Sequence, residues 1–326
     1  MPERQHFTIG ETDIAPGTRA HVELPVSRLF TGAEVAMPVT VLHGAEDGIT
    51  MWINAAIHGD EINGVEIVNR VLSQLDPKQM RGTLLAVPVV NVHGFMSGDR
   101  YLPDRRDLNR SFPGSSKGSL ASRMANLLMT EVISHCSVGV DLHTASDNRT
   151  NLPQIRANLD DAETRTLAEV FGAPLIINSK NRSGTLRQAA VKEGKSVLLY
   201  EAGEPLRFNR LCIDTGVAGV RRVLRHLGVA DWDGPEPGPV AESRSSAWVR
   251  ASQSGVARID VEIGESVTEG QQMGTIIDAF GKRLSTIKAR RTGLVIGRTL
   301  YPLVNQGDAL VHVASLESEG ESAAQS

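Results

Sequence analysis

The sequence predicts an α/β fold, with a mixed or mostly parallel sheet covered by helices on both faces, followed by a smaller all-β domain. Between residues 50 and 227, short apolar runs alternate with segments whose apolar residues recur at helical spacing. The composition changes between residues 231 and 246, and the chain beyond alternates like strands and contains frequent glycine. Strands that alternate with helices favour a sheet covered on both faces.

The first domain is expected to begin with antiparallel strands and to continue with strand and helix units. Alternating runs broken by Gly, Pro and Asp fill residues 19–51. Further strands are expected at residues 50–57, 82–91, 138–144, 173–179 and 196–201. Helices are expected at residues 65–75, 120–133, 162–171, 186–191 and 215–227. Residues 1–235 are therefore assigned to this domain.

The second domain follows a stretch of Pro, Gly, Ser and acidic residues, "DWDGPEPGPVAESRSS", which is typical of a linker. We place the linker at residues 236–246 and the β-rich domain at residues 247–315. This domain repeats itself, since "SGVARIDVEIGESVTEGQQMGTIID" parallels "TGLVIGRTLYPLVNQGDALVHVA". Two related hairpin units suggest a small β-barrel or sandwich. The polar end, residues 316–326, is expected to be disordered.

Composition argues against several classes of partner. The 34 Lys and Arg residues against 38 Asp and Glu give a formal charge of −4, with no long block of one sign, so nucleic acid is not an expected partner. No apolar run approaches the roughly 18 residues that a membrane helix needs, and no signal peptide is visible. The two cysteines have no CxxC spacing, which fits a cytoplasmic protein.

The stretch "NAAIHGDEING" places a histidine and a glutamate three residues apart at the end of an apolar run. At a helix start, positions i and i+3 lie about 5–6 Å apart, so His58 and Glu61 could converge on one zinc ion. Alone, the pair is weak evidence, because the start of a surface helix explains it equally well. The hypothesis of a metal site needs a third ligand.

His143 in "VGVDLHTAS" is the best candidate for that ligand. It ends an apolar strand, and ligands of parallel sheets bind at the carboxyl ends of strands. A hydrogen-bonded core or loop histidine is the alternative. Asp141, two residues earlier, could orient a ligating imidazole or could be a buried, hydrogen-bonded carboxylate.

Two further patterns point to a substrate site. In "RYLPDRRDLNRSFPG", the adjacent Asn109 and Arg110 offer an amide and a planar guanidinium, which suit a carboxylate. A solvated loop with surface ion pairs is the other reading of this segment. Glu201 ends the apolar strand in "SVLLYEAGE", a costly place for a charge unless it faces a cleft or a partner. A general base would occupy such a position, although a helix-capping or ion-paired glutamate is the alternative.

Taken in order, "HGDEINGVEI", "DLNRSFPG", "DLHT" and "LYEAGE" resemble the succinylglutamate desuccinylase/aspartoacylase family of zinc carboxypeptidase-like hydrolases. The resemblance covers about residue 30 to about residue 230. It implies a zinc-carboxypeptidase-like mixed sheet and one Zn²⁺ per chain, held by His58, Glu61 and His143. It also implies that Glu201 is the catalytic acid/base.

The resemblance further implies that Asn109 and Arg110 hold the substrate carboxylate and that an upstream arginine polarises the scissile carbonyl. Arg100 is the candidate for that arginine, but the longer spacing of "RYLPDRRDLNR" leaves Arg105 and Arg106 open. Arg187 in "SGTLRQAA" is a further candidate for substrate contact or, equally, an exposed helix residue after a Ser-Gly-Thr cap.

The β-rich domain is similar to the barrel appended to many predicted deacylases of this family, and distantly to biotinyl and lipoyl modules. Lys282 in "DAFGKRLS" lies near the position of a carrier lysine, but the neighbours typical of such a site are missing. We expect this domain to shield the cleft or to build a homo-oligomer.

Together these features predict a zinc-dependent hydrolase that cleaves the amide bond of a small N-acyl amino acid. Two alternatives stay open. One is a zinc carboxypeptidase that acts on peptides, and the other is a catalytically silent binding or carrier protein. A site with three protein ligands and a nearby base favours catalysis, because a structural zinc site usually has four protein ligands.

Overall fold

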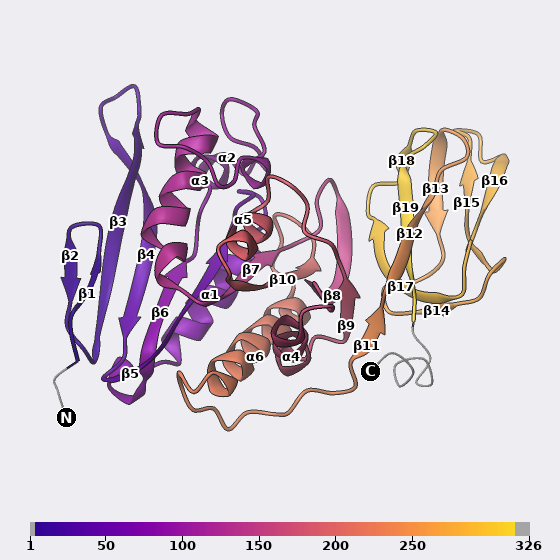
Figure 1. The fold of residues 1–326 in the computed structure, drawn as a ribbon. Helices are drawn as coiled ribbons and strands as arrows, with labels where there is room; N and C mark the ends of the chain where they lie inside the picture. Colours follow the sequence, from indigo (N-terminus) through magenta and orange to yellow (C-terminus); the bar gives the residue numbers. More distant parts are fainter. Residues whose placement is uncertain (1–3, 317–326) are drawn as a thin grey trace.

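A computed structural model describes residues 4–316 of the chain. A large mixed sheet runs through the molecule, with helices on both faces, and a smaller all-β region lies at the far end from the N-terminus (Figure 1). This confirms the predicted fold class. Among the described residues, no helix is long and apolar enough to cross a membrane.

The strands of the first part are β1 (Phe7–Ile9), β2 (Thr12–Ile14), β3 (Thr18–Arg28), β4 (Glu34–His43), β5 (Glu46–Ala55), β6 (Arg81–Val87), β7 (Val138–His143), β8 (Arg149–Ala157), β9 (Leu175–Asn178), β10 (Ser196–Gly203) and β11 (Ala241–Ser243). Its helices are α1 (Asn63–Ser73), α2 (Val92–Ser97), α3 (Leu120–Glu131), α4 (Ala162–Phe171), α5 (Leu186–Lys192) and α6 (Arg210–His226). Short 3-10 turns occupy Pro77–Gln79, Leu108–Arg110 and Ile133–His135.

The central strands run in the order β3-β4-β6-β5-β7-β10-β8. β5 pairs in parallel with β6 and with β7, and β10 pairs in parallel with β7, while β3, β4 and β8 join as antiparallel neighbours. The carboxyl ends of β5, β7 and β10 therefore meet at one edge of the sheet. Ligand sites of α/β sheets are found at this edge.

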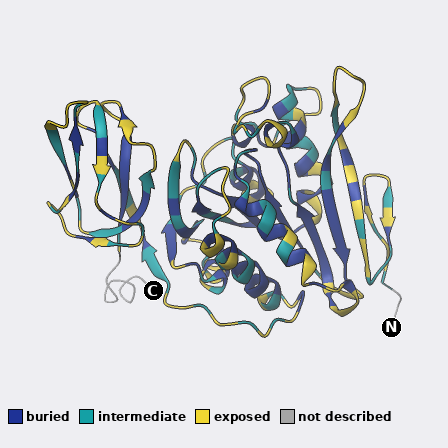
Figure 2. Cartoon of the chain, turned by 180° about the vertical axis from the view of Figure 1, so that it is seen from behind, coloured by how far each residue is buried: buried dark blue, intermediate teal, exposed yellow. Residues whose placement is uncertain are grey.

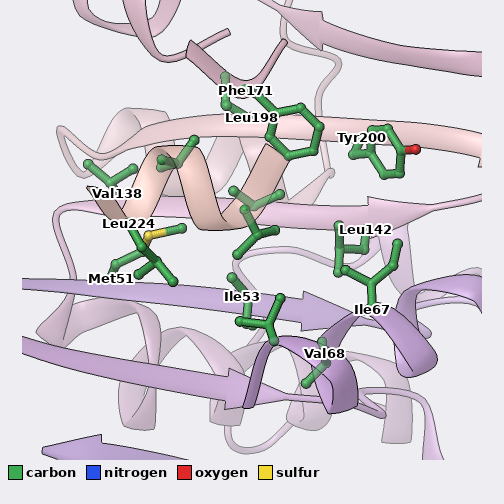
Figure 3. Packing of buried hydrophobic residues seen from close by; sticks show 14 of the residues in the cluster. Met51, Ile53, Ile67, Val68, Val138, Leu142, Phe171, Leu198, Tyr200 and Leu224 are labelled. Atoms are coloured by element: carbon green, nitrogen blue, oxygen red, sulfur yellow. The ribbon is translucent and has the colours of Figure 1, made fainter. Parts of the chain in front are cut away.

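Apolar side chains cover both faces of this sheet. On one face, α1, α4 and α6 pack through residues such as Ile67, Leu167 and Val220, and Figure 3 shows part of this cluster. On the other face lie α2, α3 and α5. Figure 2 shows most of the central strands buried, while exposed residues lie mainly on the outer faces of helices and in loops. Burial of this apolar surface is the main force that holds the layers together.

Close packing between β5 and β7 depends on one glycine. A Cβ atom on Gly139 would lie 2.0 Å from Cε2 of the buried Trp52. The indole fills the space that any other side chain at this position would need. This contact fixes the spacing of the two strands that lead to His58 and His143.

The C-terminal strands are β12 (Ser245–Arg250), β13 (Gly255–Ile259), β14 (Ser266–Val267), β15 (Gln272–Ile277), β16 (Arg283–Lys288), β17 (Gly293–Thr299), β18 (Leu303–Val304) and β19 (Ala309–Ser315). The sequence repeat appears as two related units, because β14 pairs with β17 of the other unit and β18 pairs with β13. A separate apolar core lies between the strands.

The C-terminal region joins the main sheet by strand pairing. β17 pairs antiparallel with β8, so the order continues β8-β17-β19-β12. β11, inside the predicted linker, pairs in parallel with β9. The division of the chain into domains stays a prediction, and the tail predicted to be disordered, except Leu316, lies outside the described residues.

Candidate metal centre and active site

The structure brings together the three residues proposed as zinc ligands. His58 follows β5, Glu61 precedes α1, and His143 is the last residue of β7. All three are buried, and one nitrogen or oxygen atom from each lies within 4.8 Å of the others. Because β5 and β7 are parallel neighbours, their carboxyl ends place the two imidazoles side by side.

Glu61 lies between the two imidazoles. Its Oε1 is 2.8 Å from Nδ1 of His58, its Oε2 is 2.7 Å from Nδ1 of His143, and the backbone N–H of Thr144 donates to Oε2 at 3.1 Å. Burial alone would raise the pKa of Glu61, but His58 and His143 outweigh it and hold that pKa well below its usual range. Glu61 is therefore a carboxylate that faces two nitrogen donors.

Each imidazole has a second carboxylate at its other nitrogen. Nε2 of His58 lies 3.1 Å from Oδ1 of Asp107, and Nε2 of His143 lies 3.0 Å from Oδ2 of Asp141. The second contact lacks hydrogen-bond geometry, since neither atom has a well-directed partner among residues 4–316. Asn54 donates to the other Asp141 oxygen at 2.7 Å. Asp141 is therefore a buried carboxylate that accepts a hydrogen bond from Asn54 and lies beside the His143 imidazole.

Asp107 is a site residue that the sequence analysis missed. Its carboxylate contacts His58, and it caps the turn that contains the Asn-Arg pair by accepting from the backbone N–H of Asn109 at 2.8 Å. Burial would raise the pKa of Asp107, but His58, followed by Arg100 and Arg110, outweighs it and holds that pKa well below its usual range. The Asp-x-Asn capping pattern in "DLNR" was the available signal.

Arg100 is the arginine that lies at the cluster. Its guanidinium donates to Oε1 of Glu61 at 2.9 Å and to Oδ2 of Asp107 at 3.3 Å. Arg105 and Arg106 are both exposed, and Arg106 forms an ion pair with Asp104. Of the three candidates, Arg100 is the one that contacts Glu61 of the cluster.

A polar cavity of ≈ 320 Å³ opens beside the cluster. Cations outnumber acids along its wall, where only Glu61 and Glu201 are acidic. The lining cations are Arg100, Arg110, Arg149, Arg156, Lys180, Arg182 and Arg187. Such a wall favours an anionic ligand, because the cations raise its local concentration.

Asn109 and Arg110 both line this cavity. Oδ1 of Asn109 accepts from the backbone N–H of Leu186, the first residue of α5, at 2.9 Å. Its amide is therefore held by the start of a neighbouring helix. Arg110 is exposed, and its guanidinium donates to the carbonyl of Asn109. Both residues thus lie on the cavity wall, and their role in binding a substrate carboxylate stays a prediction.

Arg187 is buried and lines the cavity, so the alternative of an exposed helix residue is wrong, while contact with a substrate stays a prediction. It donates to the carbonyl of Arg156, to Oγ of Ser179 and to the carbonyl of Lys180. No carboxylate of the described residues forms an ion pair with it. Burial, followed by the charge of Arg156, lowers the pKa of Arg187 to about 10. The sequence could not predict this burial, because α5 packs against β10 only in the tertiary fold.

Glu201 lies on β10 directly beside His143 on β7. Its Oε2 accepts from Nδ2 of Asn151 at 2.7 Å and lies 3.4 Å from Nη2 of Arg156. Its Oε1 has no hydrogen bond or ion pair among the described residues. Asn151 and Arg156 lie on β8, a strand that the sequence analysis did not predict.

One wall residue comes from the C-terminal region. Trp248 on β12 lines the cavity, stacks on His312 with ring centroids 4.6 Å apart, and has the Arg149 guanidinium 5.4 Å from its ring centroid. Sequence reasoning missed Trp248, since nothing local in "SSAWVRA" indicates contact with a distant cavity. The C-terminal region therefore contributes to the site.

The mixed sheet covered by helices and the buried His-Glu-His cluster at its carboxyl edge place the chain in the class of α/β proteins with a candidate metal site. Within this class, the chain belongs to the succinylglutamate desuccinylase/aspartoacylase family. The model of the family's catalytic domain, "Succinylglutamate desuccinylase/Aspartoacylase catalytic domain", matches residues 47–227, more than half of the chain.

Curated relatives carry names within this family. The chain is 26% identical over 310 residues to N-alpha-acetyl-L-2,4-diaminobutyric acid deacetylase of Halomonas elongata, with 90% of each chain covered. It is 30% identical over 132 residues to succinylglutamate desuccinylase of Pseudomonas aeruginosa, which covers 36% of this chain and 38% of that protein.

Solved structures share the whole fold. A succinylglutamate desuccinylase/aspartoacylase from Rhodobacter sphaeroides superposes with a TM-score of 0.81 at 28% identity and covers 92% of this chain and 96% of that one. The ectoine utilization protein EutE (DoeB) from Ruegeria pomeroyi, in its product-bound form, gives a TM-score of 0.84 at 23% identity and covers 96% of both chains. At 23% identity, the likeness to EutE (DoeB) shows a shared fold.

Proposed function

We propose that this protein is a zinc-dependent hydrolase that cleaves the amide bond of a small N-acyl amino acid and releases a carboxylic acid and an amine. One observation carries the proposal. The His58, Glu61 and His143 cluster and the Glu201 carboxylate lie along the wall of the same cation-lined cavity. The names of the relatives, a deacetylase and a desuccinylase, support the same reaction class.

The donor set fits zinc. Two imidazole nitrogens and a carboxylate converge in a buried site, and each imidazole has a carboxylate at its second nitrogen, an arrangement that orients ligating histidines. His58, Glu61 and His143 would hold the ion. When bound, zinc would supply Lewis-acid polarisation of the acyl carbonyl and would lower the pKa of the attacking water.

In this proposal Glu201 moves the proton. Oε1 of Glu201 takes a proton from the attacking water as the new C–O bond forms. The same oxygen then gives that proton to the amine nitrogen as the C–N bond breaks. Water and amide are thereby converted to acid and amine. Because Oε2 of Glu201 accepts a hydrogen bond from Asn151, Oε1 is the oxygen available for both proton transfers.

The surrounding cations orient the substrate. Arg100, 2.9 Å from Glu61, is close enough to the cluster to donate to the carbonyl oxygen as negative charge develops there. Asn109 and Arg110 line the cavity and bind the carboxylate of the amino acid. The remaining guanidiniums add an electrostatic bias for anionic substrates.

The size of the cavity favours a small substrate over a peptide. Its ≈ 320 Å³ is at the low end of the roughly 300–1,000 Å³ range of small-molecule pockets. Trp248 of β12 contributes to its wall from outside the main domain. An N-acyl amino acid fits this space better than an extended chain.

The test is amine release from N-acetyl, N-succinyl and N-formyl amino acids and short peptides by zinc-loaded protein. Glu201→Gln serves as the blank. Release from N-acyl amino acids that is absent in the blank supports the proposal and identifies the acyl class. Release from peptides alone favours a carboxypeptidase, and equal release by the blank refutes the proton-transfer role of Glu201.

A further inference from the structure

The Glu201 carboxylate is held by a residue from a different strand. Nδ2 of Asn151 donates to Oε2 at 2.7 Å, and Asn151 is only 6% exposed, so water competes little for this hydrogen bond. A hydrogen bond to an ionised carboxylate in a buried setting is among the stronger ones in proteins. Arg156 lies near the same oxygen at 3.4 Å. Neither contact involves Oε1 of Glu201, which has no hydrogen bond or ion pair among the described residues.

The backbone of Asn151 is fixed from both sides. On one side it is the register partner of Gly203 on β10, and on the other it is the register partner of Gly297 on β17. β17 belongs to the C-terminal region and contributes Val295 to the apolar core of that region. Asn151 therefore lies on a strand that pairs on one side with β10, the strand of Glu201, and on the other side with β17 of the C-terminal region.

Gly297 leaves room for the Asn151 amide. A Cβ atom at position 297 would lie 2.8 Å from Oδ1 of Asn151, which is closer than real Cβ contacts. The next nearest atoms, Cβ of His312 and Cη2 of Trp248, would be at an ordinary 3.4 Å. Gly297 has no left-handed φ, so its backbone does not itself require glycine. A larger residue at position 297 would therefore clash with the end of the Asn151 side chain.

We infer that Asn151 is a positioning residue for Glu201, and that the lack of a side chain at Gly297 of the C-terminal region leaves the Asn151 amide the room that this position needs. This inference rests on the proposed function, in which Glu201 transfers the proton. Asn151 acts by fixing Oε2, so that Oε1 points at the reacting atoms. The C-terminal region then takes part in catalysis through strand pairing as well as through the wall residue Trp248.

The test compares steady-state kinetics of the zinc-loaded full chain with Asn151→Ala and with Gly297→Ala. Each change should lower kcat about tenfold or more and leave KM within about twofold, because Glu201 is misplaced but the carboxylate grip is untouched. Gly297→Ala should still fold and bind zinc, since a flexible side-chain end can move away from the new Cβ atom. Gly238→Ala is a matched control, since its Cβ would meet nothing within 4 Å.

Double variants show whether the effects act through Glu201. In the Asn151→Ala background, Gly297→Ala should cause no further loss, and neither change should lower the residual turnover of Glu201→Gln. Independent, multiplying losses would overturn the inference. A rise in KM at constant kcat would also overturn it, since Asn151 would then bind substrate.

The same measurements separate this inference from the proposed function. Wild-type kcat in Asn151→Ala and Gly297→Ala, beside an inactive Glu201→Gln, overturns the inference and leaves the proposed function intact. Wild-type turnover in Glu201→Gln refutes the proton-transfer role and the inference with it. If Asn151→Ala fails to fold, Gly297→Ala alone decides the outcome.

Discussion

A carboxylate buried as completely as that of Glu61 needs positive or hydrogen-bonding groups around it. His58, His143, Arg100 and the backbone N–H of Thr144 fill that role. Leaving a charge without a partner in the protein interior costs several kcal/mol. The proposed zinc site explains this arrangement, because the same carboxylate and imidazoles would be its ligands.

Removing one ligand should remove the metal. His143→Ala is expected to lose stoichiometric zinc, because Glu61 and His58 alone leave a two-ligand site. Elemental analysis after dialysis measures the metal per chain. His226→Ala, an exposed histidine at the end of α6, is the matched control and should keep full zinc. Full retention of zinc by His143→Ala would exclude His143 from the ligand set.

Glu201→Gln should keep zinc and lose turnover by roughly 10²–10⁴-fold, because the amide is nearly isosteric but cannot take the proton. Stopped assays of amine release and elemental analysis on the same preparation measure both quantities. The exposed Glu193→Gln, at the end of α5, should behave like the wild type. Unchanged turnover in Glu201→Gln would remove its acid/base role.

At the scale of elements, the strand ends explain why most site residues could be predicted. His58, His143 and Glu201 each end or follow an apolar run, and such runs predict buried strands. Once β5, β7 and β10 pair in parallel, these residues have to meet. Asp107, which contacts His58, lies in a loop, and Asn151, which contacts Glu201, lies in a polar strand. Only contacts between distant parts of the chain bring these two residues to the site, and no local sequence pattern shows such contacts.

β8 illustrates the limit of sequence reasoning. Its residues "RTNLPQIRA" contain Pro153 and several polar side chains, which argue against a central strand. The strand is nevertheless paired with β10, β9 and β17. Its polar side chains Arg149, Asn151 and Arg156 line the cavity, so function overrides the usual apolar pattern.

His312 on β19 predicts a pH dependence of stability. Burial, followed by the charges of Arg156 and Arg291, lowers the pKa of His312 to about 3. Between pH 6.5 and 3 the unfolded chain takes up a proton that the folded chain does not, so the free energy of unfolding falls as the pH falls.

His312→Phe should therefore make the free energy of unfolding less dependent on pH. Between pH 7 and pH 5, the free energy of unfolding should fall by about 1–2 kcal/mol less in the variant than in the wild type, as measured by urea unfolding. His226→Ala should leave the slope unchanged, since its side chain is exposed. Equal slopes for wild type and His312→Phe would contradict a neutral, buried His312.

At the scale of the whole molecule, the C-terminal region is both separate and connected. One apolar cluster lies among its own strands, but a second joins β17 and β19 to β9, β17 extends the main sheet, and Trp248 lines the cavity. The sequence repeat identified its two units. The docking of β17 on β8 was not predictable, because it depends on residues about 150 positions apart in the chain.

Separating the chain between Arg244 and Ser245 tests this organisation. The C-terminal fragment should fold alone, because its core strands pair among themselves, and circular dichroism with thermal melting checks this. The N-terminal fragment should lose most turnover, since it loses both Gly297 and Trp248. An unstructured C-terminal fragment would refute the predicted domain boundary.

The most direct measurement is the rate of amine release from an N-acyl amino acid as zinc is added to metal-free protein. We predict no turnover at the start, a linear rise in turnover up to one zinc per chain, and no rise with His143→Ala. Turnover that is complete without metal and insensitive to chelators would contradict the central claim of a zinc-dependent deacylase.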